Sequence, residues 1–272
     1  MAATPMPAYD GTRGIMRRQK ACSPSLGRVY SSTPIILLAV LGFGLVILVA
    51  VAAHLAEKRR RQRISAFAAA RGWTWTERDD RWCDRFDGAP FGVGHNRQAR
   101  NVLRGVHDGR AFVAFDYVYY TTEHSTDSQG RSQSREVSHS YSVIGLEVGA
   151  DVPSLQVTPE GFFSRAVARL LNRDIELESE EFNRAFTVTC PDRKFAYDVL
   201  HPRAMEYLLT VRDVAWRTTA GWILTIESGK HEVVDIDRRV AVVDRILDLL
   251  PDYLRRQYGI PEHPGAGEQE TA

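Results

Sequence analysis

An apolar run of about twenty residues near the N-terminus constrains this chain more than any other feature. Residues 34–55 spell PIILLAVLGFGLVILVAVAAHL, and no side chain from 35 to 53 is ionisable. A helix rises about 1.5 Å per residue, so about 20 apolar residues suffice to cross roughly 30 Å of hydrocarbon. The run therefore predicts a transmembrane helix over residues 34–55, preceded by a disordered tail over residues 1–33.

Basic residues follow the apolar run at once. The 15 residues after Ala53 contain five cations, namely Lys58, Arg59, Arg60, Arg61 and Arg63, whereas the 15 residues before Pro34 contain only Lys20 and Arg28. Lys and Arg accumulate on the cytoplasmic side of a membrane, so this difference predicts a single-pass protein of the plasma membrane with its N-terminus outside and its C-terminal domain in the cytoplasm. A cleaved signal peptide is the alternative, but its apolar region is normally about 7 to 15 residues long.

The same cations adjoin the inner leaflet in this topology. Each Lys or Arg near an anionic membrane surface contributes about 1 kcal/mol of attraction. We therefore expect a basic juxtamembrane helix over residues 56–72, ended by Gly72. Its expected membrane-surface binding residues are Lys58, Arg59, Arg60, Arg61 and Arg63. This role is anchoring and involves no reaction.

The rest of the chain has the composition of a globular protein. With 44% hydrophobic and 25% charged residues, we expect a domain over residues 73–258 and a disordered tail over residues 259–272. The net charge of +1 gives no overall field that would attract nucleic acid. The three cysteines are too widely spaced for a disulfide framework, which agrees with a cytoplasmic domain. Only four of the 35 basic residues are lysines, a bias that suggests a GC-rich bacterial genome.

Two strand-like runs flank a tight turn in the first half of the domain. Residues 101–106 and 110–120 are rich in β-forming residues, and the Asp-Gly pair between them is typical of a two-residue hairpin turn. Apolar side chains occupy both faces of 110–120, as in a central strand covered on both sides. Residues 137–148 predict a third, antiparallel strand. Residues 121–136 contain no large aliphatic side chain, so we expect a mobile loop there.

Short elements of both kinds fill the remainder. The first signals predict a strand at Trp73 and Trp75, a strand over 155–157, and a helix over 162–171 started by Thr158 and Pro159. Next we expect strands over 175–177 and 185–189 around a helical turn at 179–183, then a helix capped by Asp192 and a helix begun by Pro202. The last elements predicted are a hairpin of 214–218 and 222–227 and a closing helix over 237–258 interrupted by Pro251. Regular βαβ alternation is missing. The predicted fold class is therefore α+β, with one N-terminal transmembrane helix followed by a domain of antiparallel strands with flanking helices.

Local signatures of catalysis or cofactor binding are absent from the sequence. Gly92 and Gly94 lack the third glycine of a dinucleotide site, and Gly229-Lys230 lacks the earlier glycine of a P-loop. No HExxH, CxxC or GxSxG motif occurs. The sequence therefore predicts no catalytic, cofactor-binding or metal-ligating residue at a local motif.

Isolated polar residues have plainer explanations than a site. We expect His124 with Asp127, and His231 with Glu232, to be exposed loop residues rather than metal ligands. Cys190 precedes a predicted helix N-terminus, a setting that can lower a thiol pKa, but a buried and inert cysteine is the commoner case.

Several segments carry a resemblance to known sequences. They are GVHDGRAFVAFDYVYY at 105–120, FNRAFTV at 182–188, DRKFAYDVLHPRAMEYLL at 192–209, and the closing helix near Leu249-Leu250-Pro251. With them the chain resembles a group of uncharacterised actinobacterial single-pass membrane-anchored proteins. The resemblance covers most of residues 35–258 and implies one N-terminal membrane helix followed by a cytoplasmic domain. No function is attached to that group, so it implies no chemistry.

These observations lead to two functional hypotheses. The first is a membrane-anchored cytoplasmic binding or interaction module whose partners are the anionic inner leaflet and an unknown protein or small ligand, but no nucleic acid. The alternative is a membrane-tethered enzyme, a hydrolase whose active-site residues are distant in sequence. A deep pocket lined with several titratable groups would favour the enzyme, and an exposed sheet edge or apolar patch would favour the binding module.

Overall fold

The computed structural model describes residues 33–126, 132–160 and 175–261. The chain divides into two compact units, Met1–Ala52 and Ala53–Ala272. Apart from Thr33, the predicted N-terminal tail lies outside the described residues, as does the predicted helix over 162–171. At the other end, Ile260 lies in the core, so the domain continues past Tyr258, where it was predicted to end.

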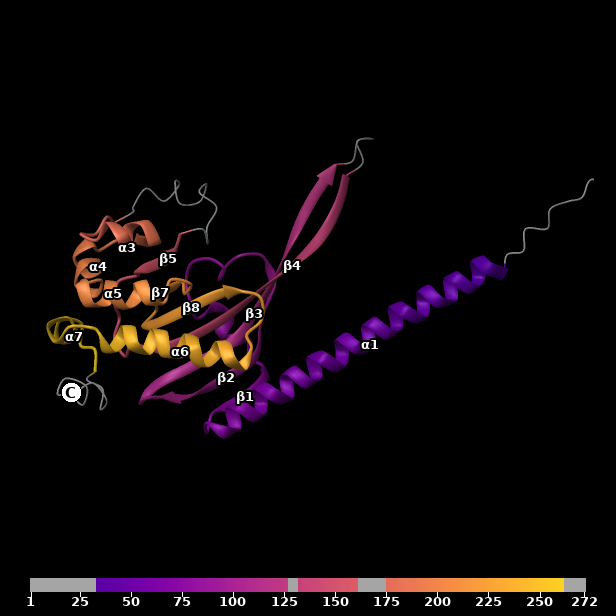
Figure 1. Ribbon diagram of the computed structural model, residues 1–272, viewed down its shortest axis with the longest axis horizontal. Helices are drawn as coiled ribbons and strands as arrows, with labels where there is room; N and C mark the ends of the chain where they lie inside the picture. The colour runs from indigo at the N-terminus through magenta and orange to yellow at the C-terminus, as the bar shows by residue number, and fades with distance from the viewer. Residues whose placement is uncertain (1–32, 127–131, 161–174, 262–272) are drawn as a thin grey trace, which may run out of the picture. The chain divides into compact units, whose positions relative to one another are not determined.

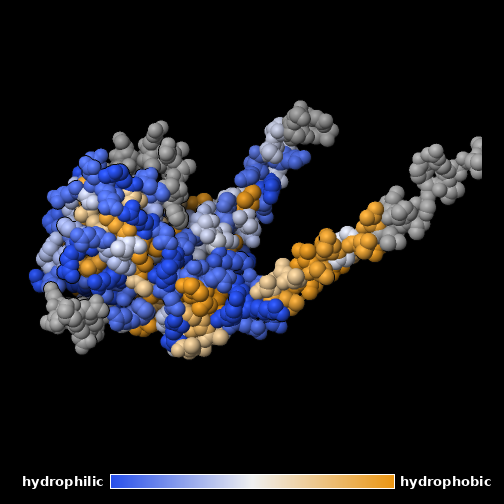
Figure 2. Space-filling model, in the orientation of Figure 1, coloured by the Kyte–Doolittle hydropathy of each residue, from blue (hydrophilic) through white to orange (hydrophobic). Residues whose placement is uncertain are grey.

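Helix α1 (Thr33–Ala70) contributes its first part to the first unit. It is long and apolar enough to cross a membrane, and the most apolar stretch of its described residues has no buried side chain. Figure 2 shows hydrophobic residues along this helix. Phe43 and Leu48, for example, are 69% and 65% exposed. Exposed apolar side chains over this length fit a hydrocarbon surrounding. A helix with the length and composition of a membrane span is therefore present where the sequence predicted one.

The second unit is built on one antiparallel sheet. Its strands are β1 (Thr74–Arg78), β2 (His95–His107), β3 (Arg110–Thr126), β4 (Ser132–Glu147), β5 (Gln156–Pro159), β6 (Phe186–Thr189), β7 (Trp216–Thr219) and β8 (Trp222–Ser228). The order across the sheet is β1-β2-β3-β4-β8-β7-β5-β6, and each pair is antiparallel. With helices packed on the sheet, this architecture confirms the predicted α+β fold class (Figure 1).

The predicted hairpin is formed by β2 and β3. Asp108 and Gly109 at its turn both have positive φ, at 45° and 72°, as a type I′ turn requires. β4 pairs with β3 as expected.

The mobile loop predicted over residues 121–136 is wrong for the residues described there. Residues 121–126 pair with residues 132–137 from Thr121↔Val137 to Thr126↔Ser132, which extends the β3–β4 hairpin beyond the rest of the sheet (Figure 1). The lack of aliphatic side chains only means that this part has no core to cover. The ladder hydrogen bonds are made by the backbone and do not require apolar side chains.

The sheet is covered on both faces, as the alternation along β3 predicts. Phe112 and Ala114 lie in a large cluster that faces the helices, while Val113 and Phe115 lie in a second cluster with Phe86. The 3-10 helix η1 (Asp80–Asp84) and the segment that follows it cover this second face.

The helices are α3 (Glu180–Ala185), α4 (Arg193–Val199), α5 (Pro202–Thr210), α6 (Val233–Asp248) and α7 (Asp252–Tyr258). The predicted cap at Asp192 and the predicted start at Pro202 are correct: the Asp192 side chain accepts from a backbone N–H of α4, and Pro202 begins α5. The helical turn predicted at 179–183 is present as α3, and the structure shows in addition that the Ser179 side chain accepts from a backbone N–H of that helix. Pro251 separates α6 from α7.

Several elements differ from the prediction. Residues 175–177 form no strand, although the Ile175 N–H donates to the carbonyl of Val188. Thr158 and Pro159 end strand β5 rather than starting a helix, because their backbones pair with Thr187 and Phe186. The closing helix begins at Val233, before the predicted residue 237.

Candidate functional site

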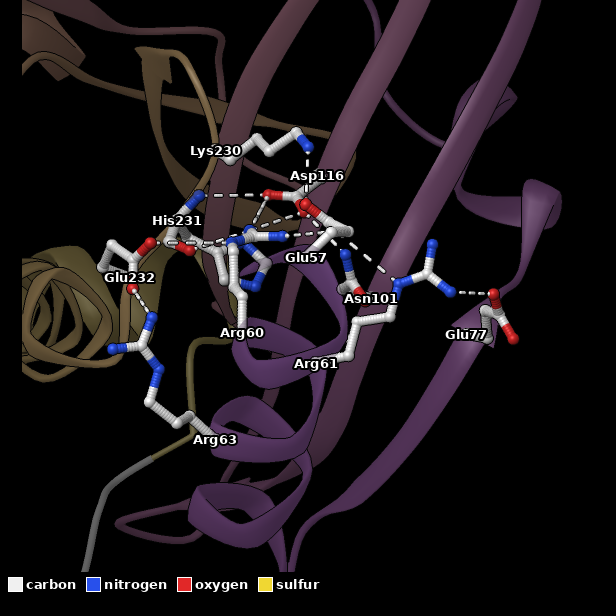
Figure 3. Close-up of polar contacts among 10 residues, drawn as sticks. All are labelled: Glu57, Arg60, Arg61, Arg63, Glu77, Asn101, Asp116, Lys230, His231 and Glu232. Carbon is white, nitrogen blue, oxygen red and sulfur yellow. Dashed lines mark hydrogen bonds and ion pairs between the residues drawn. The ribbon is translucent and has the colours of Figure 1, made fainter. Parts of the chain in front are cut away.

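A carboxylate buried in the inner strand β3 is the centre of a polar cluster that joins α1, β2, β3 and the segment before α6. Asp116 on β3 is 2% exposed, and every other side chain of the stretch 111–120 around it is apolar or aromatic. It accepts hydrogen bonds from Arg60 Nη2 at 2.7 and 3.0 Å, from Asn101 Nδ2 at 2.9 Å and from the His231 backbone N–H at 3.0 Å. Figure 3 shows these groups converging from separate segments.

Local backbone geometry brings Asn101 to this carboxylate. Asn101 has a φ of 49° and lies at an irregularity in the pairing of β2 with β3, between Arg100 and Leu103. Asparagine tolerates this left-handed conformation better than most residues. The irregularity thus turns an amide donor toward Asp116 that a regular strand would place elsewhere.

Arg60 comes from α1 and is itself 6% exposed. Besides Asp116 it contacts the His231 carbonyl, at 2.8 Å from Nη2, and Glu57, at 3.3 Å from Nη1. Helical periodicity explains its inward position, because Ile64 and Phe67, four and seven residues later, are buried on the same side of the helix. The juxtamembrane part of α1 is therefore an integral part of the domain core.

The charges in the cluster balance. Four cations, Arg60, Arg61, Arg63 and Lys230, lie within ion-pair distance of four carboxylates, Glu57, Glu77, Asp116 and Glu232. Burial alone would raise the pKa of Asp116. The hydrogen bonds from His231 and Asn101 and the positive charge of Arg60 outweigh burial and hold that pKa well below its usual range. Asp116 is thus an anion at neutral pH and compensates the buried guanidinium.

His231 completes the cluster and corrects a prediction. Its side chain is fully buried, with Nδ1 3.1 Å from Asp116 Oδ1, so it is not the exposed loop residue that the sequence suggested. It lies in the short segment that joins Ser228, the last residue of β8, to Val233, the first residue of α6. Glu232 is the exposed member of that pair and bonds Arg63 at 3.5 Å.

The five predicted membrane-surface cations have different surroundings. Arg60 is turned into the domain and cannot meet lipid headgroups, because its guanidinium is enclosed by the cluster. Arg61 pairs with Glu57 and Glu77, and Arg63 pairs with Glu232. Lys58 and Arg59 are exposed and have no ion-pair partner among the described residues. The headgroup role stays a prediction for these exposed cations.

Three aspartate side chains lie close enough together to hold a metal ion. Ligand atoms of Asp108, Asp244 and Asp248 lie within 4.8 Å of one another. Arg110 forms ion pairs with both Asp244 and Asp248, the latter at 2.8 Å. The arrangement is therefore explained as an ion-pair network that joins α6 to the start of β3.

The cysteines fit the interpretation of inert thiols. Cys190 is 3% exposed and burial raises its pKa, which agrees with the buried cysteine expected there. Burial, with the nearby carboxylates of Asp80 and Asp84, raises the pKa of Cys83 to about 12.

Sequence reasoning missed Asp116, Asn101 and the burial of His231. A lone carboxylate in a strand with two apolar faces was the available signal for Asp116, since a buried charge requires a partner. Extending the stripe of Ile64 and Phe67 back by one helical turn would have found Arg60. No local pattern marks Asn101 or the burial of His231.

Comparisons with known proteins give one informative similarity. No family model and no curated protein matches the sequence. The fold is similar to the crystal structure of the mycobacterial trehalose monomycolate transport factor A, TtfA. The TM-score is 0.50 with 14% sequence identity, over 75% of this chain and 98% of that chain. At this identity the similarity concerns the fold alone.

Proposed function

We propose that this protein is a membrane-anchored interaction module whose C-terminal domain binds a protein or a small ligand at the cytoplasmic surface of the plasma membrane. The observation that carries the proposal is the buried Arg60–Asp116 pair. Only residues 56–59 separate the last residue of the apolar run, Leu55, from Arg60. Even a fully extended chain covers at most about 18 Å over the five residue steps from Leu55 to Arg60. A domain that buries Arg60 is therefore held next to the bilayer.

The charges around the anchor support the cytoplasmic orientation. Lys58 and Arg59 are exposed cations directly after the apolar run, where the positive-inside rule expects them and where anionic headgroups can bind them. The similar fold of a protein named as a transport factor for trehalose monomycolate supports a role close to membrane lipids. We also propose that the chain belongs to the group of actinobacterial membrane-anchored proteins that its sequence resembles.

Proximity labelling in cells tests the proposal with the full chain. A promiscuous biotin ligase fused to the C-terminus should label cytoplasmic domains of membrane proteins. The same set should be labelled when residues 34–55 are replaced by an unrelated transmembrane segment of equal length. Loss of the anchor should abolish this enrichment, because the domain then leaves the membrane surface.

Orientation is tested separately by fusing alkaline phosphatase or a fluorescent protein to the C-terminus. We expect fluorescence without phosphatase activity. An active phosphatase, or a labelled set that does not change when the anchor is removed, would contradict the proposal.

A further inference from the structure

A cavity of about 310 Å³ opens beside the second core cluster. Leu224 and Tyr119 of that cluster form part of its wall, together with Ile226 and Tyr141. The rings of Tyr119 and Tyr141 are stacked at 6.0 Å between centroids and make a flat aromatic side. Its volume lies at the small end of ligand pockets, which span about 300 to 1,000 Å³. The cavity can therefore take one narrow apolar chain rather than a bulky lipid.

One charged side chain lines this apolar cavity. Arg217 on β7 is only 8% exposed. Its Nη1 donates to the Ala89 carbonyl at 2.8 Å and its Nη2 to the Gly88 carbonyl at 3.1 Å, and its guanidinium carbon lies 5.5 Å from the centre of the Phe91 ring. A guanidinium has five N–H donors, and Nε of Arg217 has no partner. The two carbonyl groups hold the guanidinium in place, and N–H donors of Arg217 remain available for a ligand.

No carboxylate of the described residues lies within 4.0 Å of Arg217, and Asp87 acts on it only from farther away. Three other buried arginines each have a carboxylate within 4.0 Å: Arg60 has Asp116, Arg110 has Asp248 and Arg239 has Glu227. Burial lowers the pKa of Arg217 to about 10 against the opposing effect of Asp87, so the group is still charged at neutral pH. A buried charge without a partner is costly, and an anion in the cavity would remove that cost.

We propose that the cavity binds a single-chain amphiphile whose anionic head, a carboxylate or a phosphate, pairs with Arg217 and whose apolar chain lies against Leu224, Ile226 and Tyr141. Planar pairing of a guanidinium with two anionic oxygens supplies the specificity for the head. Apolar side chains supply the affinity for the chain. The inference deepens the proposed function, on which it rests, by naming the ligand class of the binding module.

Photolabelling of the full chain in zwitterionic nanodiscs tests this inference. Three ten-carbon probes carry a diazirine on the chain and differ only in the head: a carboxylate, a phosphate or a neutral alcohol. All three should label the apolar part of α1, which serves as an internal reference for partitioning into the bilayer. Relative to that reference, at least one anionic probe should label residues 216–228 at least tenfold more than the alcohol does. A carboxylate preference indicates a fatty-acid-like ligand and a phosphate preference a lysophospholipid-like one.

Two variants separate the charge from the space. Arg217→Gln removes the cation, and Ile226→Trp fills the cavity while it keeps the cation. Each should lower cavity labelling by the anionic probes at least tenfold. The matched control Arg238→Gln, at a more exposed arginine, should not change it. If Arg217→Gln fails to fold, Ile226→Trp decides. Equal cavity labelling by the alcohol, or undiminished labelling in the folded variants, would overturn the inference and leave the proximity-labelling test of the proposed function untouched.

Discussion

The guanidinium of Arg60 donates from Nη2 to both carboxylate oxygens of Asp116, at 2.7 and 3.0 Å, across 56 residues of sequence. This pair joins α1 to β3, an inner strand of the sheet. Both side chains are buried, so neither charge has water as an alternative partner. The pair therefore ties the juxtamembrane segment to the domain.

Breaking this pair from either side should destabilise the domain. We expect Arg60→Met and Asp116→Asn each to cost about 3 to 5 kcal/mol, because each leaves a buried charge without its partner. The double variant should cost much less than the sum of the two. Urea unfolding of the full chain in detergent, followed by tryptophan fluorescence, measures the three differences.

The exposed pair of Arg238 with Asp213 provides a matched control for this cycle. Neutralising either of its members should change stability by about 1 kcal/mol or less. Strict additivity at Arg60 and Asp116 would show that the two residues do not interact energetically.

Asp116 should also make stability depend on pH in the acid range. Its folded pKa lies below the ordinary value of 3.8, so its contribution is fully present above that value and is lost as pH falls below it. We expect the urea concentration at the unfolding midpoint of the wild type to decrease as the pH is lowered from about 5 to about 3. The midpoint of Asp116→Asn should fall less over the same range. An identical slope in the two proteins would refute the assignment.

Gly105 should tolerate no side chain. A Cβ at this position would lie 2.1 Å from Cδ1 of Trp73, whose ring is stacked on Phe112 with centroids 4.1 Å apart and whose Nε1 donates to the Val106 carbonyl. Trp73 is held on both sides and cannot move away cheaply. Gly105→Ala should lower stability by about 1 to 3 kcal/mol. Val106→Ala, at a neighbouring side chain that is 61% exposed, should have little effect in the same unfolding assay.

The two buried thiols should not react in the folded protein. The pKa values of Cys83 and Cys190 are raised, so little thiolate exists at neutral pH. Iodoacetamide at pH 7 should leave both residues unmodified, as read by peptide mass mapping, and should modify both after denaturation. Rapid selective alkylation of Cys190 in the folded chain would make the membrane-tethered enzyme the leading hypothesis.

The β3–β4 hairpin should have two levels of protection against hydrogen exchange. Residues 112–119 are covered on both faces, whereas the side chains of 123–126 are exposed. Amides of the first stretch should exchange only through global opening, and amides of the second through local fraying, roughly a hundredfold faster or more. Exchange measured by mass spectrometry on overlapping peptides distinguishes them. Equal protection of residues 112–119 and 123–126 would contradict this prediction for the β3–β4 hairpin.

Features that depend on neighbours in sequence could be predicted without the structure. The apolar run specifies a membrane helix by its length, and the Asp-Gly turn with its flanking residues specifies the first hairpin. The caps at Ser179 and Asp192 and the break at Pro251 are also local, because each depends on backbone groups within a few residues. The error over 121–136 arose where backbone pairing, rather than side-chain burial, decides the structure.

Tertiary structure decided the fate of individual charges. Lys58, Arg59, Arg60, Arg61 and Arg63 form one basic run in the sequence, yet only the helical face shared with Ile64 turns Arg60 inward. His231 reaches Asp116 across 115 residues because the sheet order places β8 beside β4 and so near β3. Arg217 lines the cavity because β7 continues that same sheet past β8. Burial and charge pairing depend on how the helices pack on the sheet. A local sequence pattern predicts them only where its period matches the spacing of residues on the buried face, as for Arg60 and Ile64.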